Sequence, residues 1–245
     1  MNDPAGPPAH KPAAPGAPRR SHAGTLFLRL LLGVVAVAVG TFVYVDWRAP
    51  LDPSAPPHLF TPFQLGLMQV FPARCPAALA RAQNLSFRPT PRPIENGCGY
   101  PDGVTITRSE ISYGGGVLLR CPAAVALVMW ERHALQPAAE EAFGRRVTSV
   151  RTFGSYSCRN VYHRENARRS QHATANALDI AGFTLAGGRS ISVLNDWKKA
   201  GPEAGFLRAV RDGACRFFGA VLSPDYNAAH ADHFHFDMGR WMTCR

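Results

Sequence analysis

The sequence predicts an α+β fold in which helices flank a small mixed or antiparallel sheet, preceded by a single transmembrane helix. Three observations lead to this prediction. Short β-branched segments alternate with segments of helical apolar spacing. Among 245 residues, 22 are glycine and 21 are proline, while only 18% are charged, which is typical of a loop-rich domain and not of a coiled coil. Only one apolar segment is long enough to cross a bilayer.

The apolar segment runs from Leu30 to Val45 and extends back to Thr25. This length matches the span of about 20 residues that a bilayer requires. Arg29 lies in the first turn, where its long side chain can reach the headgroups. We therefore expect a transmembrane anchor at residues 25–45.

The charges around this span predict its orientation. Residues 1–24 form a tail rich in Pro, Ala and Gly, and the charges of this tail are mainly basic. We expect the tail to be disordered and cytoplasmic, which places the C-terminal domain in the periplasm or outside the cell. The alternative is a cleaved signal peptide. Its small-x-small motif, Ala36-Val37-Ala38, lies inside the apolar run, which favours an uncleaved anchor.

The segment 46–66 contains repeated prolines and is predicted to be an extended linker. The folded domain is assigned to residues 67–245. Its first expected strand is 103–107, and a hairpin of 111–113 and 117–119 should turn at three glycines. Helical apolar spacing follows at 122–133, with Pro122 in the first turn, and again at 137–143.

The second half of the domain continues the alternation. A β-branched strand is expected at 147–153, and strands 178–185 and 190–194 should be joined at a Gly-Gly turn. The strongest helical pattern covers 203–218, where Phe206, Leu207, Val210, Cys215 and Phe218 lie near one face. Two short strands, 219–222 and 234–237, complete the domain.

Six cysteines follow the predicted span, namely Cys75, Cys98, Cys121, Cys158, Cys215 and Cys244. An even number in an exported domain predicts three disulfides, although free buried cysteines are the alternative. Zinc-finger spacing is absent. The sequence leaves the connectivity open, with Cys75 and Cys98 among the most local pairings.

The formal net charge is +10, and lysine occurs only at Lys11, Lys198 and Lys199, so the positive charge is nearly all arginine. A compositional bias toward arginine would explain this without any function. The functional interpretation is attraction to an anionic partner. Because no basic helix or RNA-binding motif is present, we expect no nucleic-acid partner, and peptidoglycan or another anionic envelope polymer fits better.

The residues that could bind a metal or catalyse a reaction are concentrated in two histidine clusters. In the strand 234–237 and the residue before it, side chains alternate, so His233, His235 and Asp237 should share one face while two phenylalanines face the core. In the earlier cluster, Asp179 lies on a face with small alanines. His172 comes seven residues before Asp179 and must fold back through a loop.

Imidazole and carboxylate ligands together suit Zn²⁺, and three protein ligands would leave the fourth position open, as in catalytic zinc sites. The chemistry would also need a base and a group that stabilises an oxyanion, roles which the spare histidines could fill. The alternative is that these are surface or core histidines without a metal.

The chain resembles a known family at several separate places. The matching residues are Cys75, Gly97-Cys98-Gly99, SQHATANALDIAGF from residue 170 and HADHFHFD from residue 230. They resemble the bacterial extensin-like C-terminal domain family over roughly residues 50–245. The Ser-x-His, Ala-x-Asp and His-x-His patterns are also similar to the zinc peptidases grouped with lysostaphin, D-Ala-D-Ala metallopeptidases and sonic hedgehog.

The resemblance to the peptidases implies a site, residue by residue. His172, Asp179 and His235 would be the zinc ligands, His233 would stabilise the oxyanion, and His230 would be the general base. Two features depart from the peptidase pattern. Many of those peptidases have Gly where this chain has Ala175, and many use a Glu as base, whereas no Glu lies near His233.

The leading functional interpretation is a membrane-anchored, zinc-dependent peptidase that cuts peptide bonds in peptidoglycan. A non-catalytic, zinc-containing wall-binding module is the alternative, since the similarity extends to sonic hedgehog and so does not by itself imply proteolysis. A purely structural or scaffold role is the third interpretation.

Overall fold

The computed structural model of the chain describes residues 22–240 and 242–245, and it divides into two units, 1–49 and 50–245. In the first unit, helix α1 spans His22–Arg48 and includes the predicted anchor, residues 25–45. Its window Gly24–Thr41 is long and apolar enough to cross a membrane, and none of that window is buried. Residues 1–21 of the predicted tail lie outside the described residues.

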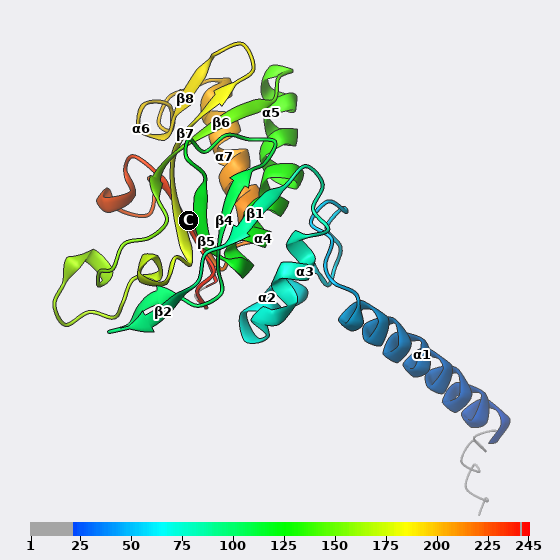
Figure 1. Ribbon diagram of the computed structural model, residues 1–245. Coiled ribbons are helices and arrows are strands. Elements are labelled where there is room, and N and C mark those ends of the chain that lie inside the picture. Colours follow the sequence, from blue (N-terminus) through cyan, green and yellow to red (C-terminus); the bar gives the residue numbers. More distant parts are fainter. Residues whose placement is uncertain (1–21, 241) are drawn as a thin grey trace, which may run out of the picture. The chain divides into compact units, whose positions relative to one another are not determined.

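The second unit contains a six-stranded mixed sheet (Figure 1). Its strand order is β11-β9-β10-β7-β6, with β8 paired to β7. All these pairs are antiparallel except β11 with β9. The bounds are β6 Val147–Gly154, β7 Ala177–Leu185, β8 Ser190–Ser192, β9 Ala220–Leu222, β10 Phe234–Asp237 and β11 Thr243–Cys244.

Two smaller antiparallel sheets lie earlier in the chain. One has the order β1-β4-β5, and the other pairs β2 with β3. The bounds are β1 Ser86–Pro89, β2 Arg92–Glu95, β3 Cys98–Tyr100, β4 Gly103–Arg108 and β5 Val117–Arg120.

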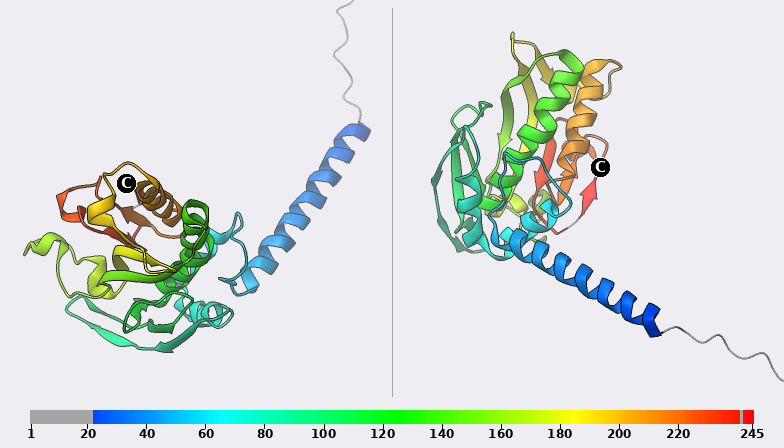
Figure 2. Two further views of the ribbon diagram at one scale, coloured as in Figure 1. Left: turned by 90° about the horizontal axis from the view of Figure 1, so that it is seen from above. Right: turned by 90° about the vertical axis from the view of Figure 1, so that its right-hand side faces the viewer.

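The principal helices form a layer beside the main sheet, and α7 runs alongside α5 (Figure 2). Every residue of α4 is buried, so this helix is the centre of the core. Trp130 at its end donates a hydrogen bond from Nε1 to the Val210 carbonyl and packs against Phe183 and Phe236. The helical bounds are α2 Thr61–Val70, α3 Cys75–Leu79, α4 Cys121–Trp130, α5 Gln136–Phe143, α6 Val193–Asp196 and α7 Pro202–Ala214, with a π-helical turn at Glu131–Leu135 and 3₁₀ turns at Pro72–Arg74, Val161–His163, Gln171–Thr174 and Ala228–His230.

The α+β prediction is confirmed, and most predicted elements have counterparts, but the helix predicted at 203–218 ends at Ala214, and other segments differ as well. Residues 111–113 do not form the first strand of a hairpin. Ile111 is buried, Ser112 makes only an isolated bridge to Ser149, and β5 pairs with β4 instead. The strand predicted at 190–194 ends at Ser192, whose hydroxyl accepts a hydrogen bond from the Asn195 backbone N–H and so starts a short helix.

The segment predicted as a linker, residues 46–66, also differs. The folded unit begins at Pro50, and Leu51 is only 6% exposed. The π-helical turn holds this segment, because His133 Nε2 lies 3.0 Å from the Pro53 carbonyl and Arg132 donates to the Ser54 hydroxyl. Repeated proline makes a chain stiff, but it does not prevent one buried leucine and these polar contacts from packing it onto the domain.

Three disulfides are present, as predicted, but Cys75 does not pair with Cys98. The bonds are Cys75–Cys121, Cys98–Cys158 and Cys215–Cys244. The first joins the starts of α3 and α4, which pack together in the core and bury both sulfurs. Tertiary packing, and not closeness in sequence, therefore decides the connectivity.

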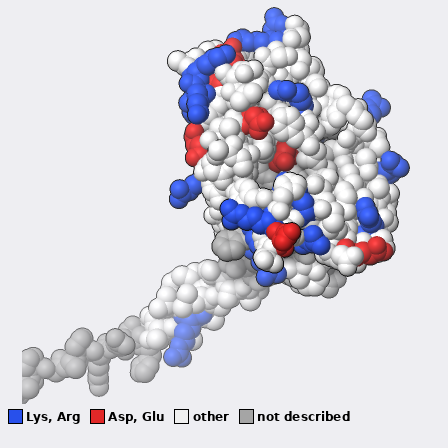
Figure 3. All heavy atoms as spheres, turned by 90° about the vertical axis from the view of Figure 1, so that its left-hand side faces the viewer, with Lys and Arg blue, Asp and Glu red and all other residues white. Residues whose placement is uncertain are grey.

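Basic side chains are spread widely over the face drawn in Figure 3, with a few acidic ones among them. A few of them make ion pairs. Arg120 forms a two-pronged contact with Asp102 at 2.7 and 3.0 Å, and Arg189 pairs with Glu203.

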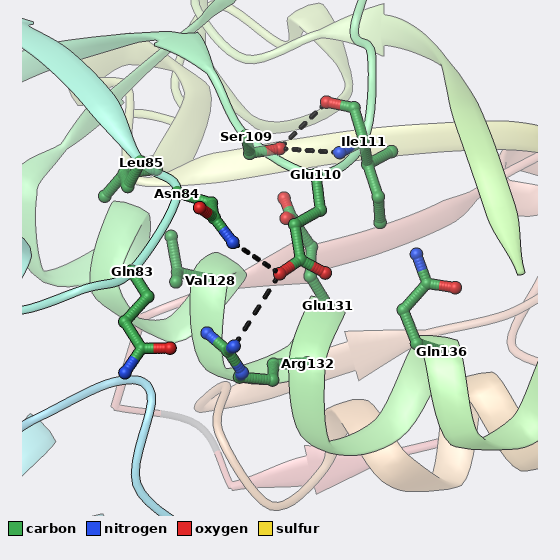
Figure 4. A pocket seen from close by; sticks show the side chains of 10 residues that line it. All are labelled: Gln83, Asn84, Leu85, Ser109, Glu110, Ile111, Val128, Glu131, Arg132 and Gln136. Atoms are coloured by element: carbon green, nitrogen blue, oxygen red, sulfur yellow. Dashed lines mark hydrogen bonds and ion pairs between the residues drawn. The ribbon is translucent and has the colours of Figure 1, made fainter.

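The first residue of the π-helical turn, Glu131, has a buried carboxyl group. Glu131 Oε1 accepts a hydrogen bond of 2.5 Å from the Tyr113 hydroxyl. In a small neighbouring cavity, Glu110 lies between Asn84 and Arg132 (Figure 4). Burial raises the pKa of Glu131 to about 8, even though the hydrogen bond from Tyr113 opposes this rise.

This environment predicts a specific pH dependence of stability. The folded protein keeps the Glu131 proton up to about pH 8, whereas the unfolded chain releases it at about pH 4.3. Between these values the folded state holds the extra proton, so this group makes the free energy of unfolding decrease as the pH rises, by up to about 1.4 kcal/mol per unit. Glu131→Gln should flatten this dependence.

The measurement is urea unfolding of the full chain in detergent at about pH 5 and about pH 8, which bracket the range in which the folded state holds the extra proton. Glu140→Gln, which changes an exposed carboxylate, is the control and should leave the pH dependence of the free energy of unfolding unchanged. The prediction is contradicted if that pH dependence is the same in Glu131→Gln as in the wild type.

Candidate metal centre

The pairing of β7 with β10 builds the centre of the site. Its register sets Asp179 directly opposite His235 and Leu178 opposite Phe236. Phe234 and Phe236 are fully buried on the other face of the sheet, as the alternation predicted. The two polar side chains therefore come from rigid, adjacent strands whose backs are fixed in the core.

His172 reaches the same place from the 3₁₀ turn before β7. The Ser170 hydroxyl caps this turn by accepting from the His172 backbone N–H. Ala175 then has a φ of 51°, which turns the chain into the strand. This left-handed conformation favours glycine, so Ala175 adopts a backbone conformation that residues with a side chain rarely take. Gln171 stabilises the turn by accepting from the Asn176 side chain.

The structure brings the three predicted ligands together. His172 Nε2 lies 3.1 Å from His235 Nδ1 and 3.2 Å from Asp179 Oδ2, and His235 Nδ1 lies 2.9 Å from Asp179 Oδ1. Among the described residues, these are the ones whose donor atoms cluster in a way that could hold a metal ion.

Hydrogen bonds on the outer sides of the rings set the positions of the ring protons. His172 Nδ1 lies 3.2 Å from the Ser155 carbonyl, which can only accept, so Nδ1 carries the proton and Nε2 is left with a lone pair. His235 Nε2 lies 3.0 Å from Asp237 Oδ2, which assigns a proton to Nε2. In the neutral rings, two nitrogen lone pairs and a carboxylate therefore converge.

Such a convergence of electron-rich atoms requires a cation. Burial lowers the pKa of His235, but hydrogen bonds and charges from Asp179 and Asp237 outweigh it and raise the pKa to about 9. Burial would also raise the pKa of Asp179, yet its contacts with His172 and His235 hold the pKa far below the ordinary range. Without a metal, a proton on His235 supplies the positive charge.

His230 lies next to this group, with its ring centroid 5.8 Å from that of His235. Its Nδ1 lies 2.8 Å from Asn227 Oδ1, and the Asn227 amide in turn donates to the Tyr162 hydroxyl at 2.9 Å. Burial, with the charges of His235 and His233, lowers the pKa of His230 to about 4. At neutral pH the ring is thus uncharged and its Nε2 carries a lone pair.

His233 forms another part of the wall. Its Nδ1 lies 2.7 Å from Asp232 Oδ1, and its Nε2 lies 3.7 Å from Asp179 Oδ1. Phe153 packs edge-on against the ring. All five histidine and aspartate side chains predicted for the site therefore line one cleft.

This cleft has a volume of about 480 Å³. The loop between β6 and the first histidine turn contributes Arg159, Tyr162 and Arg168 to its lining. The disulfide of Cys98 with Cys158 ties this loop to β3. Arg169 adds a second tie by donating to the Asn96 carbonyl.

Sequence reasoning missed part of the site. It placed Asp237 on the correct face but gave it no role, although the His-x-Asp alternation was a usable signal. It gave no indication of Arg159, Tyr162 or Arg168, because they lie in a loop without a repeating pattern. The Ser155 carbonyl is a backbone group and leaves no sequence signal.

Comparison with known proteins gives one match. A family model described as the extensin-like protein C-terminus matches residues 73–245. No curated protein and no solved structure matches the chain.

The role of Asp237 can be tested in metal-free protein. Asp237→Asn should lower the pKa of His235 from about 9, because it removes one of the two carboxylates that hold the ring proton. NMR titration of the histidine rings after chelator treatment would measure this. Asp212→Asn, at an exposed site, is the control and should leave the pKa of His235 unchanged. An unaltered pKa in Asp237→Asn would show that the Asp237 contact does not hold the proton.

Proposed function

The chain belongs to the extensin-like C-terminal family, and on this basis and the geometry of its histidine cleft we propose that it is a membrane-anchored, zinc-dependent peptidase acting on peptidoglycan. The observation that carries the proposal is the convergence of His172, Asp179 and His235. A shared proton or a metal ion could neutralise such a group, and its donor chemistry favours zinc.

The donor set fits zinc in type and in spacing. Tetrahedral zinc with bonds of about 2.0–2.1 Å requires ligand atoms about 3.3 Å apart. The three pairs here are separated by 2.9, 3.1 and 3.2 Å. The ligands would be Nε2 of His172, the Asp179 carboxylate and Nδ1 of His235. When bound, zinc polarises a substrate carbonyl and makes a water molecule more acidic.

The outer hydrogen bonds support the same assignment. Histidines that bind metals usually donate the other ring N–H to a carboxylate or a backbone carbonyl, which fixes the ring and makes it a better ligand. His172 has the Ser155 carbonyl in this position, and His235 has Asp237.

The neighbouring histidines have the positions that hydrolysis needs. His230 is oriented by Asn227 and presents the Nε2 lone pair that a general base needs, although its lowered pKa makes it a weak base. His233 presents its Nε2 edge toward Asp179 and, when protonated, can donate a hydrogen bond to an oxyanion. The residues that line the cleft include no glutamate, so His230 is the base that this proposal requires.

The substrate and the location follow from charge and from the cysteines. Arg159 and Arg168 in the cleft, together with the net charge of +10, favour an anionic peptide of the cell wall at short range. Three disulfides fit an oxidising compartment. We place the domain in the periplasm or outside the cell, with helix α1 as a single-pass anchor and the N-terminus in the cytoplasm.

Zinc binding is tested by removing its proposed carboxylate ligand. Asp179→Ala should lower the affinity for zinc, because two ligands replace three. The stabilisation of the domain that zinc produces should shrink in parallel, since a ligand of the folded state adds stability according to its affinity. Metal titration and thermal unfolding of the full chain in detergent would measure both. Asp212→Ala is the exposed control, and unchanged zinc affinity in Asp179→Ala would remove Asp179 from the ligand set.

Catalysis is tested separately from binding. His233→Ala should reduce the release of muropeptides from isolated sacculi by about 10²–10³, and His230→Ala by about 10²–10⁴. Both variants should still bind about one zinc per chain, because neither residue is a proposed ligand. His58→Ala, outside the cleft, is the control. A zinc-loaded wild type that binds sacculi but releases nothing would favour the alternative, a non-catalytic wall-binding module.

A further inference from the structure

An open apolar groove lies between α2 and the C-terminal segment, and it shares no lining residue with the histidine cleft. Its volume is about 590 Å³. Buried side chains of Phe217, Phe218 and Met238 line it, and Pro62 and Leu65 contribute from α2. The disulfide Cys215–Cys244 lies in its wall and holds the C-terminal segment in place.

Large apolar side chains project around this groove. Met242, which lines it, is 96% exposed. Val70 at the end of α2 is 67% exposed, and Leu59 just before α2 is 88% exposed. Exposed apolar side chains beside an open apolar groove indicate a surface that meets another apolar phase.

The charge around the groove has one sign. The residues that line it include no Asp or Glu. They include two exposed arginines, Arg216 and Arg240. An apolar surface with an arginine rim matches the interface of a bilayer that contains anionic lipids.

A short stretch of chain joins the folded unit to helix α1. Helix α1 ends at Arg48, and the buried Leu51 already belongs to the folded unit. The intervening residues can extend by about 10 Å at most. Such a short tether exposes the folded unit to a high effective concentration of lipid if α1 is a membrane anchor, so weak contacts are sufficient.

We propose that this groove and its arginine rim bind anionic lipid in the membrane that α1 crosses. The inference rests on the proposed membrane anchor but not on the proposed zinc chemistry. Because groove and cleft share no lining residue, lipid bound in the groove leaves the histidine cleft available to a polymer in the envelope.

The test uses the full chain reconstituted into vesicles of phosphatidylcholine, with or without phosphatidylglycerol. A photoreactive phenylalanine analogue replaces Gln69 or Met242, which both line the groove, one at a time, and lipid adducts are measured by mass spectrometry after irradiation. Leu194 and Ile94, which are 59% and 52% exposed but do not line the groove, are the matched control positions.

We expect adducts at the groove positions to exceed those at the control positions several-fold and to increase with phosphatidylglycerol. Arg216→Glu combined with Arg240→Glu should remove that increase. Equal adducts at all four positions, or cross-links to a second copy of the chain in place of lipid, would overturn the proposal. If alkaline carbonate extracts the chain from the vesicles, helix α1 does not anchor the chain in the membrane, and the groove proposal fails with the proposed anchor.

Discussion

The antiparallel pairing of β7 with β10 is the constraint on which the rest of the site depends. It places Asp179 directly opposite His235, and a shift of β10 by one residue would turn His235 toward the core. Phe234 and Phe236, buried on the opposite face, make that shift costly because it would expose two aromatic rings. The hydrophobic core therefore holds the polar site in register.

The cost of this arrangement is electrostatic. Two imidazole lone pairs and a carboxylate lie within about 3 Å of one another, and their outer hydrogen bonds prevent the rings from turning away. A protein gains nothing in stability by gathering such groups unless a cation shares them. The proposed zinc satisfies this requirement, and His230 and His233 then lie beside it with their own partners, Asn227 and Asp232.

The sequence was informative where local chemistry decides the outcome. The His-x-His-x-Asp alternation placed His235 and Asp237 on one face, and the β-branched runs located β6 and β7. It was not informative where tertiary packing decides. The pairing of Cys75 with Cys121 depends on how two helices pack, and the loop that carries Arg159 has no repeating pattern. The segment after the span was mistaken for a linker because proline content does not report the burial of Leu51.

The most direct measurement of the central claim is anomalous X-ray scattering at the zinc edge from crystals of the protein grown with zinc. We expect one strong peak within about 2.0–2.2 Å of His172 Nε2, Asp179 and His235 Nδ1. A peak at other side chains, or an empty site between the two strands at saturating zinc, would contradict the assignment of a metal centre.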